Sequence, residues 1–278
     1  MPMKTNHTRR TSMSTSILPN QIPMRERMSG PISRGHRPVG IFVGSIDPAM
    51  TEVAAAAGMD FVAVDEEHAT NDLQSISNHI RAAEATGIFA LVRVRKNDDA
   101  TLQSFLDIGA SGFLVPHIDT AGDAERAVRA THFAPVGSRG MCPNARASLF
   151  NWRDQGAHAG TINDGAIVIP IIESPKAVEN IAEIVAVDGI DMVLFGPGDL
   201  SSEMGVPVDH PSVFEAQAKV EKAVRDAGKQ LMVTLFTPEG GDAMCLNMDY
   251  MIMFDALTAL REKYPAYGKP VAQSNNAN

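Results

Sequence analysis

The sequence has little that would suit a secreted, membrane or nucleic-acid-binding protein. Only two of its 278 residues are cysteine, Cys142 and Cys245, and they are too far apart in the chain to resemble a metal-binding pair. We expect reduced thiols in a reducing compartment, with a single disulfide as the alternative. No apolar run reaches the roughly 18 residues of a transmembrane helix. A net charge of −9 argues against nucleic acids and anionic membranes as partners.

Apolar and acidic residues are scarce in the first 37 residues. Seven Lys and Arg residues stand there against one acid, Glu26, among many Ser, Thr and Pro. Because such a segment cannot bury a core, we predict that 1–37 is disordered or weakly packed. An Arg-rich and Ser-rich start also resembles an organellar transit peptide, so targeting is the alternative to the cytoplasmic location that we expect. The stretch 266–278 is predicted to be a second tail, which leaves 38–265 as the folded domain.

From residue 38 the chain alternates short apolar runs with longer segments of helical periodicity. The runs that predict strands are 39–44, 61–65, 89–94, 112–116, 166–172, 191–195, 230–235 and 250–254. Several helical segments end at a glycine, as helices often do. These glycines are Gly58, Gly87, Gly109, Gly189 and Gly228.

Continuously apolar strands are typical of a parallel sheet that helices cover on both faces. The eight units predicted between residues 38 and 265 favour a (β/α)₈ TIM barrel over a doubly wound sheet. No G-x-G-x-x-G motif follows the first strand, which argues further against a dinucleotide-binding fold. The connection over residues 132–165 is unusually long. We expect it to contain a short helix and to cover a site or a neighbouring subunit.

Polar residues stand at the predicted carboxyl ends of the strands, where a barrel carries its active site. The second strand runs into Asp65, Glu66, Glu67 and His68, a crowded set of like charges that a strand end does not need. The third strand ends near Arg93, the fifth at Glu173, and the sixth in "FGPGDLS" with Asp199. The sequence therefore predicts that carboxylates, an imidazole and an arginine meet at one face.

Glu173 and Asp199 follow neighbouring strands, with no Cys or His motif beside them. Two such carboxylates suit a hard divalent cation, and we predict Mg²⁺ or Mn²⁺ with water or substrate oxygens at the open positions. Each residue alone could instead serve a helix N-terminus.

The neighbouring residues suggest how a substrate would be held. The glycines of "GPGDLS" allow close approach to a carboxylate-bearing ligand. Arg93 could stabilise a developing enolate, or it could be an ordinary salt-bridge arginine at the rim. The spacing of Asp65 and His68 permits a base dyad. His117 is a weaker candidate, and Arg139 and Arg146 could present cations or lie on a solvated loop.

The chain resembles the class II, metal-dependent pyruvate aldolases of the HpcH/HpaI type, to which macrophomate synthase is related. The resemblance covers about residues 38–265 and rests on several short motifs together. They are "DEEHA" (65–69), "LDIGA" (106–110), "GSRG" (137–140), "ARAS" (145–148), "IE" (172–173) and "FGPGDLS" (195–201).

The resemblance implies a TIM barrel of the phosphoenolpyruvate/pyruvate type and a role for each matching residue. Glu173 and Asp199 correspond to the ligands of a divalent metal, either Mg²⁺ or Mn²⁺, with Co²⁺ as a substitute. The backbone of Gly198 and Asp199 corresponds to the part that holds the pyruvate carboxylate. Arg93 corresponds to the arginine that stabilises the enolate. His68, supported by Asp65, corresponds to the base.

The expected function is reversible cleavage of a 4-hydroxy-2-oxo acid to pyruvate and an aldehyde, through a pyruvate enolate held on the metal. The rivals are oxaloacetate decarboxylation or macrophomate-synthase-like chemistry of the same enolate, and a catalytically silent barrel that serves as a binding subunit. The expected partners are a small 2-oxo acid and an aldehyde, with neither nucleic acid nor membrane. The resemblance also implies a homo-oligomer, with a hexamer favoured.

Overall fold

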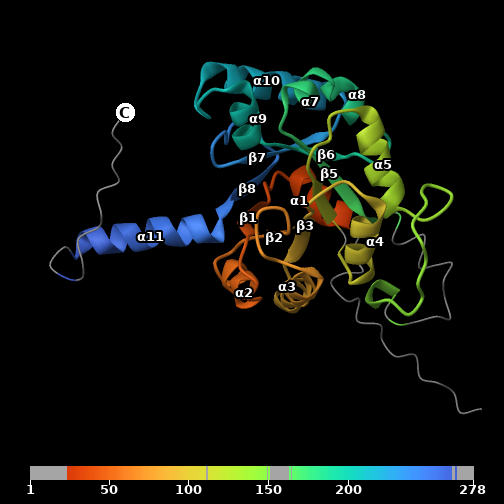
Figure 1. The fold of residues 1–278 in the computed structure, drawn as a ribbon, viewed down its shortest axis with the longest axis horizontal. Helices are drawn as coiled ribbons and strands as arrows, with labels where there is room; N and C mark the ends of the chain where they lie inside the picture. Colours follow the sequence, from red (N-terminus) through yellow and green to blue (C-terminus); the bar gives the residue numbers. More distant parts are fainter. Residues whose placement is uncertain are drawn as a thin grey trace, which may run out of the picture.

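Eight short strands pair in sequence order and close into a parallel barrel in the computed structural model of the chain (Figure 1). The structure describes residues 24–110, 112–148, 150, 163, 165–264 and 267. The strands are β1 (Val39–Val43), β2 (Phe61–Asp65), β3 (Phe89–Arg93), β4 (Gly112–Val115), β5 (Ile167–Ile172), β6 (Met192–Phe195), β7 (Gln230–Thr234) and β8 (Ala243–Met248). Parallel pairing of Val39 with Met244 joins β1 to β8. The predicted (β/α)₈ barrel is confirmed.

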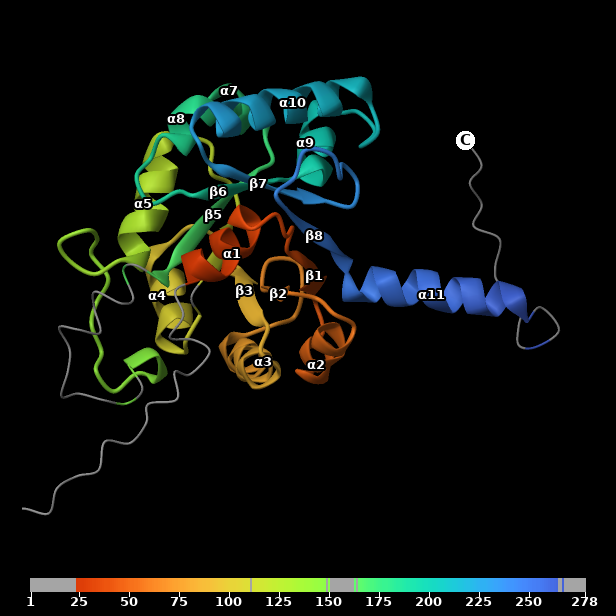
Figure 2. The same ribbon diagram turned by 180° about the vertical axis from the view of Figure 1, so that it is seen from behind.

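The helices between the strands form the outer layer of the barrel (Figures 1 and 2). They are α2 (Ala49–Ala56), α3 (Leu73–Thr86), α4 (Asp99–Asp107), α5 (Ala121–Thr131), α7 (Pro175–Glu179), α8 (Ile181–Val185), α9 (Pro197–Met204) and α10 (Pro211–Asp226). Alternate strand residues face the two sides of the sheet. On β2, Val62 and Val64 pack in the cluster shared with the helices, whereas Phe61 and Ala63 pack inside the barrel. Both faces are buried, which explains why the strands are continuously apolar.

Local sequence fixes most helix ends. Asp72 caps α3 with its side chain accepting from the Ser75 N–H at 2.8 Å, and Asp98 and Thr120 cap α4 and α5 in the same manner. The five glycines predicted to end helices all have positive φ, as left-handed end positions require.

The eighth predicted strand is wrong. Residues 250–254 form the first turns of helix α11 (Asp249–Lys263), and the true eighth strand, β8, comes just before it. A five-residue apolar run cannot by itself distinguish a strand from a helix. In β8 the apolar run is interrupted by Asn247, and only Ala243 and Cys245 are buried. Figures 1 and 2 both show α11 projecting away from the barrel instead of packing on it.

Part of the predicted N-terminal tail is a helix, α1 (Met24–Ser33). Met28 is fully buried in the cluster that fills the barrel interior, and the Ser29 hydroxyl donates to the Gln230 side chain at 3.2 Å. Gln230 begins β7, so α1 covers the amino-terminal end of the barrel. This segment packs more firmly than its composition suggested. Residues 1–23 lie outside the described part of the chain, as does the predicted C-terminal tail 266–278 except for Tyr267.

The long connection after α5 carries a single turn of 3₁₀ helix, Arg146–Ser148, within its described part. Two arginines attach the connection to the outer helices. Arg139 donates to Asp107 of α4 at 3.0 Å, and Arg146 pairs with Glu84 of α3 and donates to the Ile108 carbonyl at 3.2 Å. Both cations therefore serve the scaffold. Among the helices described, none is long and apolar enough to cross a membrane.

Candidate active site

The polar residues predicted at the strand ends gather at the carboxyl-terminal mouth of the barrel. Asp65 and Arg93 are the last residues of β2 and β3, and they are register partners in the sheet. Glu173 directly follows β5, and Asp199 lies in the first turn of α9, just after β6. The barrel topology brings these residues together because all its strands run in one direction.

Asp65 and Arg93 form a buried, two-pronged ion pair. The Arg93 Nε and Nη2 atoms donate to the two Asp65 carboxylate oxygens, each at 2.8 Å. The Asp65 side chain is fully buried, that of Arg93 is 14% exposed, and the guanidinium lies over the Phe42 ring. Burial alone would lower the pKa of Arg93, but the hydrogen bonds and charge of Asp65 outweigh it and raise that pKa. Arg93 is thus a fixed cation at the site.

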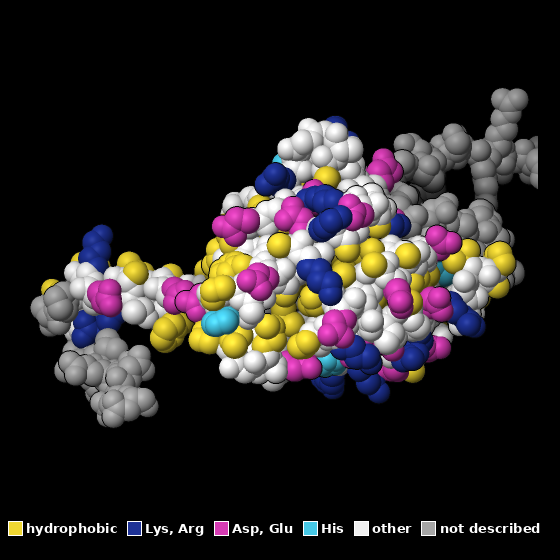
Figure 3. Space-filling model, turned by 90° about the horizontal axis from the view of Figure 1, so that it is seen from above, with side chains coloured by type: hydrophobic (Ala, Val, Ile, Leu, Met, Phe, Trp, Pro, Cys, Tyr) yellow, Lys and Arg dark blue, Asp and Glu magenta, His cyan; other side chains and the backbone are white. Residues whose placement is uncertain are grey.

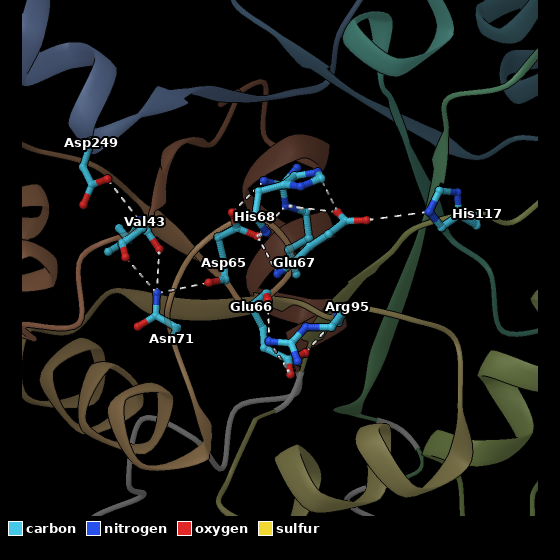
Figure 4. Close-up of polar contacts among 11 residues, drawn as sticks. Val43, Asp65, Glu66, Glu67, His68, Asn71, Arg95, His117 and Asp249 are labelled. Carbon is cyan, nitrogen blue, oxygen red and sulfur yellow. Dashed lines mark hydrogen bonds and ion pairs between the residues drawn. The ribbon is translucent and has the colours of Figure 1, made fainter. Parts of the chain in front are cut away.

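Glu67, to which the sequence analysis gave no individual role, lies at the centre of the site (Figure 4). Its Oε2 atom is 3.5 Å from the His68 Nε2 atom and 3.6 Å from the Arg93 Nε atom, and its Oε1 atom is 3.9 Å from the His117 Nε2 atom. Burial, opposed by the charge of Arg93, raises the pKa of Glu67. Its place in the crowded stretch directly after β2 was the available signal.

The predicted pairing of Asp65 with the His68 ring is not what the structure shows. Asp65 accepts from the His68 main-chain N–H at 3.4 Å, while the ring of His68 faces Glu67. The reason is that Arg93 occupies both Asp65 oxygens. The third carboxylate of the stretch, Glu66, accepts from the Arg95 main-chain N–H at 2.9 Å (Figure 4). The carboxylates at the end of β2 are therefore used differently: Asp65 binds the Arg93 side chain, Glu66 binds the Arg95 main chain, and Glu67 faces the His68 ring.

His117, which follows β4, contributes mainly through its backbone. Its main-chain N–H donates to Glu173 Oε1 at 2.9 Å, and its φ of 54° is in the left-handed region that non-glycine residues seldom adopt. The ring is 74% exposed, with Nδ1 3.7 Å from the same Glu173 oxygen. Strained backbone at a residue that binds Glu173 is typical of a functional site, where the surrounding structure holds the unfavourable conformation.

Glu173 is buried, and burial raises its pKa to about 7. The His117 N–H opposes this rise, while the negative charges of Glu67 and Asp199 add to it. Gly196 allows the end of β6 to lie close to Glu173, because a Cβ at position 196 would be only 3.0 Å from the Glu173 Cβ. Asp199 is exposed at the mouth.

The donor set suits a hard divalent cation. Glu173 and Asp199 supply carboxylate oxygens, and neighbouring negative charge disfavours ionisation of Glu173 in the absence of a cation. The described residues include no cluster of three or more His, Cys, Asp and Glu side chains that could enclose a metal.

Backbone groups complete the mouth. A Cβ on Gly198 would meet nothing within 4 Å, so the first turn of α9 faces open space. Its N–H groups are available to an anion there. On the other side, the Asn71 side chain donates to the Val43, Gly44 and Asp65 carbonyls at 3.1 to 3.3 Å, which ties the ends of β1 and β2 together (Figure 4).

Comparison with known proteins gives consistent matches across the barrel. The model of the HpcH/HpaI aldolase/citrate lyase family matches residues 38–252. The chain is 31% identical to 2-keto-3-deoxy-L-rhamnonate aldolase of Escherichia coli O1:K1 / APEC, over 84% of this chain and 90% of that protein. The solved structure of citrate synthase SbnG is 29% identical with a TM-score of 0.77, covering 86% of this chain and 97% of the other. Macrophomate synthase is 25% identical with a TM-score of 0.75, covering 89% and 92%.

Proposed function

The chain belongs to the HpcH/HpaI aldolase/citrate lyase family and is a carbon–carbon lyase, and from this premise we propose that it reversibly cleaves a 4-hydroxy-2-oxo acid to pyruvate and an aldehyde. The observation that carries the proposal is the buried Arg93–Asp65 pair at the barrel mouth, where Glu173 also lies. Cleavage next to a 2-oxo group leaves negative charge on the 2-oxo oxygen, and a fixed guanidinium in a partly dry mouth stabilises such charge.

We assign Glu173 and Asp199 as the residues that hold a divalent cation, with Mg²⁺ or Mn²⁺ as the preferred ions and Co²⁺ as a substitute. When bound, the cation supplies Lewis acidity that favours charge on the substrate oxygens. The open first turn of α9, at Gly198 and Asp199, is suited to the carboxylate of the substrate.

The remaining steps fall to the chain's own side chains. His68 is half-exposed at the mouth and can take the proton of the substrate's 4-hydroxyl group as the bond between C3 and C4 breaks. Arg93 then faces the enolate oxygen, held in place by Asp65. In the synthetic direction His68 returns the proton to the new alkoxide. No lysine is required, because the scheme has no Schiff base.

We also propose that the protein is a homo-oligomer, with a hexamer favoured by the family resemblance. Helix α11 exposes large apolar side chains on several sides, as Figure 3 shows along the projecting segment. These residues are Tyr250, Met251, Ile252, Met253, Phe254, Leu257 and Leu260, between 41% and 69% exposed. An apolar surface of this kind on a single copy marks an interface, and a second copy of the chain is the occupant we propose.

The test is proton exchange at the pyruvate methyl group in D₂O, followed by NMR, with Mg²⁺ or Mn²⁺ present and then with chelator. We expect proton exchange that chelator abolishes and added cation restores. We also expect cleavage of one or more members of a panel of 4-hydroxy-2-oxo acids that release different aldehydes. Glu173→Ala and Asp199→Ala should lose both activities, whereas Glu203→Gln, an exposed change on the same helix as Asp199, should keep them.

Three results would contradict the proposal. Full activity in chelator would exclude the cation, and a lysine adduct trapped by borohydride with pyruvate would show a different mechanism. Consumption of oxaloacetate without any aldehyde requirement, and with no aldol cleavage, would favour the decarboxylase alternative, to which the likeness to macrophomate synthase gives weight.

A further inference from the structure

The two carboxylates that flank His68 differ in what they are free to do. Asp65 is saturated. Its Oδ1 accepts from Arg93 Nε at 2.8 Å and from the main-chain N–H groups of Glu67 and His68 at 3.0 and 3.4 Å, and its Oδ2 accepts from Arg93 Nη2 at 2.8 Å. Both oxygens of this fully buried carboxylate are engaged, which makes it a poorer partner for an imidazole N–H than a carboxylate with an unused oxygen.

Glu67, in contrast, has a carboxylate oxygen without a hydrogen-bond donor in the described part of the chain. Its side chain is only 9% exposed, yet its Oε2 atom accepts no hydrogen bond from any residue that the structure describes. A buried carboxylate oxygen left without a donor is costly, so a donor belongs there. The nearest ring nitrogen is Nε2 of His68 at 3.5 Å, which a small rotation of the half-exposed ring would bring into hydrogen-bonding distance (Figure 4).

We propose that Glu67 is the positioning residue of the base, accepting the Nε2–H of His68, while Asp65 serves only to hold Arg93. The proposal rests on the proposed function for its catalytic meaning, since it supplies the orientation that His68 needs as a base. Because Nε2 carries the proton toward Glu67, Nδ1 of His68 is the atom that accepts the proton of the substrate hydroxyl.

The division of labour follows from the chemistry of the two partners. Arg93 is always charged and almost buried, so it needs a counterion that never leaves it. His68 changes its protonation state in each cycle, and its partner must support the ring in both states. One carboxylate with both oxygens bound to a guanidinium cannot serve the two purposes at once.

His117 is the competing partner of Glu67, on the other oxygen. Its Nε2 atom is 3.9 Å from Oε1, farther than His68 from Oε2, and its ring is more exposed. The experiment must therefore separate the two imidazoles, which the variants His68→Ala and His117→Ala allow.

The first test needs no turnover. In ¹⁵N-histidine-labelled protein, His68→Ala identifies the signals of the His68 ring, and their shifts report which nitrogen carries the proton when the ring is neutral. We expect the Nε2–H form in the native protein and a mixture of both forms in Glu67→Gln. Glu66→Gln is the matched control, since Glu66 pairs with Arg95 and should leave the His68 signals unchanged. A native ring without tautomer preference, or one that Glu67→Gln does not alter, overturns the proposal.

The second test is kinetic and uses a double-mutant cycle. Glu67→Gln should lower kcat for aldol cleavage at least about 10- to 100-fold, the cost of removing the carboxylate partner of a metal-bound histidine, and should leave KM close to native. It should cost nothing further in the His68→Ala background and keep its full effect in the His117→Ala background. Equal losses with and without His68, or a loss that requires His117, overturns the assignment. If the native protein shows the expected tautomer but cleaves no 4-hydroxy-2-oxo acid, the proposed function fails and the positioning stands.

Discussion

Replacing Asp65 by asparagine would test how much the fold itself depends on the ion pair of the active site. The change keeps the shape of the side chain but removes the charge that faces Arg93, whose guanidinium is 14% exposed. Removing one partner of a buried pair costs about 3–5 kcal/mol, because the other charge is left without compensation.

Two features of the structure moderate that cost. The Arg93 Nε atom lies 3.6 Å from Glu67, and the guanidinium stacks at 4.5 Å on the Phe42 ring centroid, a contact worth about 1 kcal/mol. We therefore expect a loss near the lower end, about 3 kcal/mol in the free energy of unfolding. If the free energy of unfolding falls by about 3 kcal/mol per molar urea, the urea concentration at the midpoint of unfolding should fall by about 1 M.

The assay is urea unfolding followed by far-ultraviolet circular dichroism, with unfolding and refolding curves compared. Asp226→Asn is the control, since it removes the partner of Lys222 in a pair with side chains 76% and 64% exposed, and it should cost less than about 1 kcal/mol. If Asp65→Asn costs no more than this surface control, the pair contributes little to stability and the reasoning fails. The variant should also lose proton exchange at the pyruvate methyl group, because Arg93 is no longer held.

Further predictions concern the cation, the strained residue and the projecting helix. Burial raises the pKa of Glu173 from 4.5 to about 7, so the stability contributed by its protonated form in cation-free protein is full below 4.5 and lost as pH rises through about 7. Cation affinity should accordingly increase with pH up to about 7, and isothermal titration should record proton release that Glu173→Gln abolishes. His117→Gly should keep or raise the melting temperature because glycine accepts a φ of 54°, whereas His117→Val should cost about 1–2 kcal/mol. Phe254→Lys together with Met251→Lys should lower the mass measured by sedimentation to that of a smaller assembly, while the exposed change Glu262→Lys should not; unchanged mass in both would refute the interface at α11.

The barrel could be predicted because its pattern is local. Apolar runs of four to six residues, helical spacing between them and capping residues such as Asp72 are each read from a few neighbouring positions. The eighth strand was missed for the same reason. Residues 250–254 are apolar without being part of the barrel core, and no local rule distinguishes a residue buried by its own chain from one exposed on a projecting helix.

The sequence by itself determined where the site lies and four of the residues that meet there, because parallel strands place all their carboxyl ends on one side of the barrel. Asp65, Arg93, Glu173 and Asp199 could be assigned to one site on that argument alone. What only the tertiary structure decided is which of them touch. Whether the His68 ring faces Asp65 or Glu67 depends on the Arg93 side chain of the neighbouring strand, which donates hydrogen bonds to both oxygens of Asp65. Hydrogen-bond partners are chosen by competition in three dimensions, and spacing along the chain carries no record of that competition.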